Sequence, residues 1–265
     1  MTESTKTPFI RRIFKFRQTE GRIWLLDELR GLSILLMILH HAAYDAKYMF
    51  GAELPVDSVV VYVLHIIFAS LFVLISGAAC RLTHSNLKRG AVCFGCGLLI
   101  TAVTGIVMPD SIVVFGILHM LGIAMMLFAL ARPALDKISP AAGIVVFSML
   151  AVLTFRIPEG YVGIPYLLEW RLPRVLYSTE FLFFLGLPSP AFFSGDYFPL
   201  VPWLFVFIAG SYAGVYLKQR RCPDYFYKMH CRALAAVGQN TLVIYMLHQP
   251  VIYGLLYILF IYIIK

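Results

Sequence analysis

Residues 59–81 read VVVYVLHIIFASLFVLISGAACR, an apolar run that reaches no charged residue before Arg81 at its end. A helix needs about 20 consecutive apolar residues to cross the hydrocarbon core of a bilayer. The whole 265-residue chain has the same character, since 60% of it is hydrophobic, 14% is charged and its mean hydropathy is +0.82. A soluble domain is about 45–50% apolar and about 25% charged. The sequence therefore predicts an integral membrane protein.

Similar runs along the chain predict an all-α, polytopic bundle of about seven transmembrane helices. These spans are residues 23–43, 59–81, 91–108, 112–131, 141–155, 200–217 and 234–264. The last run is long enough to tilt or to begin as an interfacial segment. Residues 181–187 are too few to span and predict a short re-entrant or interfacial segment. We expect a basic leader, residues 1–22, followed by a single transmembrane domain, residues 23–265.

Basic residues gather in the leader and in alternate loops. They are Arg11, Arg12, Lys15, Arg17 and Arg22, then Arg81, Lys88 and Arg89, then Arg132 and Lys137, then Lys218, Arg220, Arg221, Lys228 and Arg232. With seven spans, the positive-inside rule places the N-terminus in the cytoplasm and the C-terminus outside. The same rule explains the net charge of +8. We expect no nucleic-acid partner, because no soluble basic segment interleaved with aromatic residues is present.

Cys93 and Cys96 form a C-x-x-C motif, but it lies inside an apolar run without a second pair of ligands. A structural zinc site needs about four ligands. We therefore expect no metal site and interpret these cysteines as packing groups.

The first span carries ionisable residues at depth, where a charge costs at least about 2.5–3.5 kcal/mol and is a functional candidate. Arg30 and His41 are separated by about 20° around the helix axis and about 16 Å along it, whereas His40 points about 80° away from that stripe. Asp45 follows His41 at i+4 and can accept a hydrogen bond from its imidazole. Such a pair is typical of a general base. The alternative is a snorkelling Arg30 with two interfacial histidines.

Five sequence blocks, in order from residue 23 to the C-terminus, carry a family resemblance. They are Asp27-x-x-Arg30-Gly31 with Met37 and His41-x-x-x-Asp45, then 72–77 (FVLISG), 114–122 (VFGILHMLG), 196–203 (DYFPLVPW) and 238–250 (GQNTLVIYMLHQP). Together they resemble the heparan-alpha-glucosaminide N-acetyltransferase catalytic-domain family, in its short bacterial branch. The Arg…His opening and the Tyr-x-x-His-x-Pro close are also similar to the wider acyltransferase-3 group.

The resemblance implies a membrane acyltransferase that moves an acetyl group from cytoplasmic acetyl-CoA to a carbohydrate or glycolipid acceptor at the outer side of the membrane. It implies a bacterial plasma-membrane location and permits a homodimer. The lysosomal members carry a lumenal domain before this region, which this sequence lacks, so we do not expect heparan sulfate itself as the acceptor. His41, oriented by Asp45, would deprotonate the acceptor. Direct attack on the thioester and an acetyl-histidine intermediate both remain open.

Two arginines suit the phosphates of acetyl-CoA, because guanidinium forks match phosphate oxygens. Arg30 lies at the predicted cytoplasmic end of the first span, and Arg81 directly ends the second. No glycine-rich phosphate loop is present, so side-chain cations would have to bind the coenzyme.

Three further residues are candidates for lining the substrate site or a cavity. His119 is flanked by Gly116 and Gly122, which let helices approach closely, so it is either a satisfied core histidine or a substrate contact. His248 lies two residues before Pro250, whose kink favours a cavity over plain packing. Asp196 could contact an acceptor sugar or cap the span that begins at residue 200.

A small transporter or flippase is the alternative function. Buried histidines and a broken last span are also typical of proton-coupled carriers. The chain shows no internal repeat and no matched pair of interrupted spans, which favours the enzyme.

Overall fold

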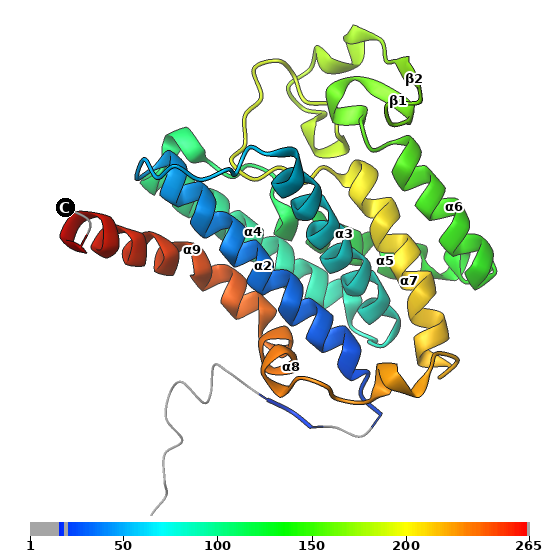
Figure 1. Ribbon diagram of the computed structural model, residues 1–265. Helices are drawn as coiled ribbons and strands as arrows, with labels where there is room; N and C mark the ends of the chain where they lie inside the picture. Colours follow the sequence, from blue (N-terminus) through cyan, green and yellow to red (C-terminus); the bar gives the residue numbers. More distant parts are fainter. Residues whose placement is uncertain (1–15, 19–20, 264–265) are drawn as a thin grey trace, which may run out of the picture. The chain divides into compact units, whose positions relative to one another are not determined.

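The computed structural model describes residues 16–18 and 21–263. Arg11, Arg12 and Lys15, and with them most of the predicted leader, lie outside the described residues. The described part is predominantly helical (Figure 1). Its α-helices are α2 (Trp24–Tyr48), α3 (Val59–Arg81), α4 (Asn86–Val107), α5 (Ile117–Leu135), α6 (Pro140–Leu153), α7 (Leu200–Lys218), α8 (Arg232–Gln239) and α9 (Thr241–Ile258), and α9 continues as a π-helical turn, η6 (Leu259–Ile263).

Among the described residues, six helices are long and apolar enough to cross a membrane, which confirms the polytopic helical fold. They are α3, α4, α5, α6 with its continuation to Glu159, α7, and α9 with its continuation to Ile261. Helix α2 has 25 residues but is not among them, because charged residues and histidines lie toward both of its ends. The count of seven spans, which requires α2 to cross the membrane, stays a prediction.

The chain forms two compact units: Met1–Phe72 with Cys222–Lys265, and Val73–Arg221. In the first unit, α2 packs against both α8 and α9. In the second, α4 packs against α5, and α6 against α7. The first unit therefore joins the beginning of the sequence to its end.

Several predicted spans differ from the observed helices in their bounds, and two of these differences have a clear structural cause. The span predicted to begin at residue 112 becomes helical only at Ile117, because the preceding segment is extended. Backbone hydrogen bonds from Gly195 to Ile112 (2.8 Å) and from Phe198 to Phe115 (2.9 Å) fix that extended segment. The long last run is interrupted at Asn240, which separates α8 from α9.

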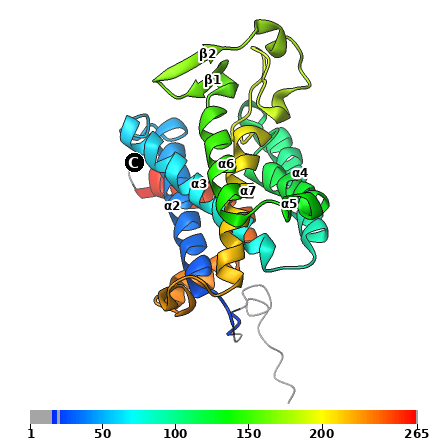
Figure 2. The same ribbon diagram turned by 90° about the vertical axis from the view of Figure 1, so that its right-hand side faces the viewer.

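The segment between α6 and α7 contains a small antiparallel hairpin, β1 (Tyr161–Ile164) and β2 (Leu168–Arg171), that the sequence analysis did not predict. Figure 2 shows it beyond the end of α6. Arg156 donates to Glu169 on β2 (2.6 Å) and to Glu159, which precedes β1 (2.7 Å), and so links the hairpin to the segment after α6. Residues 181–187, predicted as a re-entrant or interfacial piece, hold only a short 3-10 turn, η4 (Phe183–Leu185).

Candidate functional site

Helix α8 lies close against the first turns of α2. A Cβ added to Gly31 would collide with the carbonyl oxygen of Leu234, and one added to Gly238 with the carbonyl oxygen of Asp27. Glycine at both positions therefore permits the close approach of the two helices. The buried Glu28 carboxylate completes the contact, since its Oε1 accepts the backbone N–H groups before α8, at 2.6 and 2.9 Å.

Two guanidinium groups meet one carboxylate at the same end of α2. Asp27 is 5% exposed and accepts from Arg30 Nη1 at 3.2 Å and from Arg22 Nε. Arg30 is therefore held in place by an ion pair, with the buried Glu28 carboxylate in the same turn of α2.

Helices α2 and α9 bring four polar side chains together. The rings of His41 and His248 are 5.2 Å apart between centroids. One turn further along α2, Asp45 Oδ2 accepts a hydrogen bond from Gln249 Nε2 at 2.7 Å. Asp45 is 2% exposed, so this donor stabilises a carboxylate that water hardly reaches. Two adjacent α9 residues thus face the predicted His–Asp pair of α2.

The expected hydrogen bond from His41 to Asp45 is absent from the described hydrogen bonds, because the carboxylate is turned to Gln249 instead. The roughly 40° between positions i and i+4 allows the two side chains to find different partners on α9. His41 has His248 beside it. Asp45 and His41 thus contact adjacent residues of α9 rather than each other.

The backbone determines which nitrogen of His248 carries its proton in the neutral form. Nδ1 lies within hydrogen-bond distance of the Tyr245 carbonyl oxygen, which can only accept. Nδ1 is therefore protonated, and in the neutral ring Nε2 keeps its lone pair. A neutral His248 can accept a proton at Nε2.

Two further histidines extend this group. The His40 ring is 6.0 Å from that of His41 and 4.6 Å from that of His65 on α3. His40 points away from the Arg30–His41 stripe of α2, so helix spacing alone does not place it, or His65, beside His41. The one sequence feature that marks His65 as a functional candidate is that it is an ionisable residue within an apolar span.

In the second unit, His119 is a satisfied core histidine. It is 3% exposed, its Nδ1 accepts the Gly116 N–H at 3.2 Å, and its Nε2 lies 3.2 Å from Thr101 Oγ1. Since Nδ1 accepts, Nε2–H donates to the threonine, whose own hydroxyl donates to the Val113 carbonyl at 2.6 Å. His119 therefore caps the start of α5, and we do not place it in the site.

Asp196 caps a different helix from the one expected. Its Oδ2 accepts the backbone N–H of Ile117 at 3.4 Å, at the first residue of α5, and Pro199 occupies the N-cap position of α7. The parallel bridge between Phe115 and Tyr197 brings Asp196 to that helix end. Its predicted contact with an acceptor remains untested.

Arg81 is 5% exposed and lies between the rings of Phe128 and Tyr212, at 5.0 and 5.3 Å. Its Nη1 is paired with Asp136, and its Nε donates to the Ser211 carbonyl at 3.2 Å. Within the described residues, Nη2 is buried without a hydrogen-bond partner. Because Arg81 is neutralised and enclosed, we do not carry it forward as a phosphate ligand.

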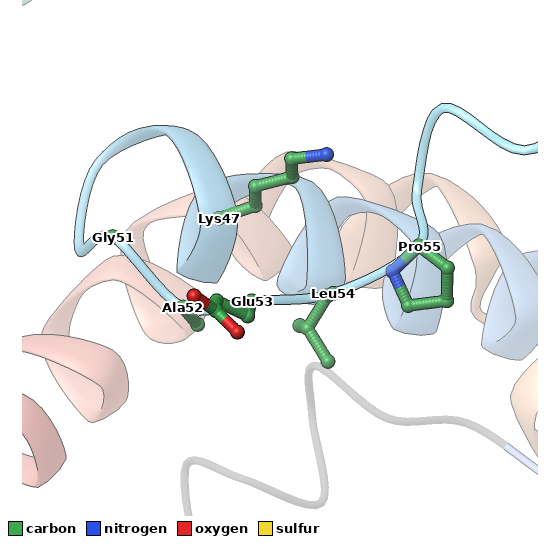
Figure 3. A pocket seen from close by; sticks show the side chains of 6 residues that line it. All are labelled: Lys47, Gly51, Ala52, Glu53, Leu54 and Pro55. Carbon is green, nitrogen blue, oxygen red and sulfur yellow. The ribbon is translucent and has the colours of Figure 1, made fainter.

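A pocket follows the end of α2 (Figure 3). Its lining residues are Lys47, Gly51, Ala52, Glu53, Leu54 and Pro55. Hydrogen bonds from Lys47 and Tyr48 hold the pKa of the nearby Asp57 carboxyl below its usual value. Lys47 is six residues beyond His41 in the same helix, or about 9 Å along the axis.

These features define a class: an integral membrane protein of many helices. Histidines from three of its helices lie near a buried carboxylate, Asp45, and its amide partner, Gln249. The chain belongs to the family described as heparan-alpha-glucosaminide N-acetyltransferase, catalytic, which matches residues 22–250. It is thus a membrane protein of an acetyltransferase family, and the match includes every site residue discussed above. Neither the curated proteins nor the solved structures provide a match to it.

Proposed function

We propose that the protein transfers an acetyl group from cytoplasmic acetyl-CoA to a carbohydrate acceptor at the outer side of the membrane. The observation that carries this proposal is the pairing of His41 with His248 where α2 packs on α9. An imidazole at depth, beside a second imidazole, suits removal of a proton from an acceptor hydroxyl or amine.

In the proposed reaction the coenzyme phosphates bind at Arg30, and the pantetheine arm runs along α2 toward His41. Arg30 and His41 belong to one unbroken helix, so about 16 Å along its axis separate them. His41 takes the proton of the acceptor while the acceptor oxygen or nitrogen attacks the thioester carbonyl. The C–S bond breaks, and the thiolate is protonated by cytoplasmic water.

Asp45 has a positioning role in this proposal. Its bond to Gln249 sets the register of α9 on α2, and that register places His248 beside His41. The pocket after α2 is the place where we expect the acceptor to approach, beyond the site on the predicted outer side.

The first test is to incubate native membranes with radiolabelled acetyl-CoA and to identify the labelled product. We expect a labelled carbohydrate or glycolipid. Calorimetric titration of the purified protein with acetyl-CoA supplies the second measurement. Arg30→Ala should weaken binding about tenfold or more, whereas Arg171→Ala, exposed on β2, should not change it. Absence of acetyl-CoA binding together with transport of a sugar or lipid would identify a carrier and refute the enzyme.

A further inference from the structure

The His40–His65 pair takes no part in the proposed acyl transfer, yet it lies beside the group that does. Each ring is half-buried, and the centroids are 4.6 Å apart. Ionisable residues are rare in membrane helices, because lipid does not solvate them. Two such residues, one on α2 and one on α3, therefore require an explanation beyond packing.

With His41 and His248, these rings form a continuous file across three helices. Neighbouring centroids are 5.2 Å (His248 to His41), 6.0 Å (His41 to His40) and 4.6 Å (His40 to His65) apart. An imidazole can accept a proton at one nitrogen and release one from the other. At these separations transfer between rings can proceed directly or through one water molecule.

The face of α2 that carries His40 continues in polar groups toward the predicted outer end. Tyr44 and Tyr48 follow at successive turns, with ring centroids 4.5 Å apart. The Tyr48 hydroxyl donates to Asp57, whose side chain is 61% exposed. The spacing of these polar groups along α2 therefore points from His40 toward an exposed carboxylate.

The proposed reaction needs such a route, and this inference rests on that proposed function. For each turnover the acceptor loses one proton to His41, and the departing thiolate takes one from the cytoplasmic side. His41 must then lose its proton before the next turnover. We propose that His40 and His65 form a proton path that carries this proton from His41 toward Asp57 and the outer solvent.

Titratable residues occur around the path on α2, α3 and α9 and at the outer end. They are His248 and Tyr245 on α9, His65 and Tyr62 on α3, His41, Tyr44 and Asp45 on α2, and Lys47, Tyr48 and Asp57 at the outer end. Asp45 is held by Gln249. On α2, His40 lies next to His41 and on the face that carries the two tyrosines, and His65 on α3 is the ring beside it.

The test compares His65→Phe and His40→Phe with His84→Phe, a control in the exposed loop between α3 and α4. Phenylalanine retains a ring of similar size but cannot carry a proton. In nanodiscs we expect the acetyl-transfer rate constant to fall at least tenfold in the first two variants, with an unchanged KM for acetyl-CoA. Added imidazole should restore much of the lost rate, and the control should match the wild type.

Rescue distinguishes a proton path from a structural role, because imidazole does not refold a damaged bundle. A wild-type rate in either variant would overturn the proposal, and so would reduced rates that imidazole does not restore. A wild-type protein that transfers no acetyl group would refute the proposed function itself. A fully active His65→Phe protein beside an active wild type would refute only the path.

Discussion

Gln249 provides the sharpest test of how α9 is held on α2. Gln249→Leu keeps a similar volume and removes the Nε2 donor that Asp45 accepts at 2.7 Å. A hydrogen bond to a charged group contributes about 1.5–3 kcal/mol, and its loss leaves a carboxylate that is only 2% exposed without this donor. We therefore expect the free energy of unfolding to fall by about 1.5–3 kcal/mol, which is roughly a tenfold to hundredfold change in the equilibrium constant.

The assay is thermal unfolding of the purified protein in nanodiscs, with the acetyl-transfer rate measured on the same samples. Gln249→Leu should lower both, because the His41–His248 contact depends on the same helix pairing. Thr241→Val, a comparable polar-to-apolar change at the start of α9, should alter neither by much. Wild-type stability and rate in Gln249→Leu would show that the amide does not fix this register.

Two further predictions concern helix packing at Gly31 and the hydrogen bonds of His119. Gly31→Ala should lower the free energy of unfolding by about 1–3 kcal/mol and weaken acetyl-CoA binding, because the new methyl group collides with α8 beside Arg30. Gly254→Ala on α9 meets nothing within 4 Å and should be neutral or stabilising in the same thermal unfolding and calorimetric measurements. His119→Ala should destabilise the protein by about 1–3 kcal/mol through the loss of two hydrogen-bond partners, while KM for acetyl-CoA and the rate per folded molecule stay within about twofold of wild type. A severalfold change in that KM would return His119 to the substrate site.

Properties that depend on one helix were readable from the sequence. Apolar runs of span length predicted the long helices, because lipid requires about 20 apolar residues in a row. The placement of Arg30 and His41 along α2 follows from helix geometry alone, and α2 is unbroken between them.

Properties that depend on contacts between distant segments were not readable. Nothing in the spacing of α2 shows that Gln249 approaches Asp45, some two hundred residues away in the chain. For the same reason the sequence does not show that Asp196 caps α5, or that His65 lies beside His40. Which side chain caps a helix, and which residues pair between helices, can be determined only from the three-dimensional structure.

The most direct test of the account is the acetyl-transfer rate of His41→Ala, measured beside the wild type with radiolabelled acetyl-CoA and the identified acceptor. The account predicts transfer at the background rate, with acetyl-CoA affinity and thermal stability close to wild type. Transfer at the wild-type rate by a folded His41→Ala protein would contradict the assignment of the reaction to the contact between His41 on α2 and His248 on α9.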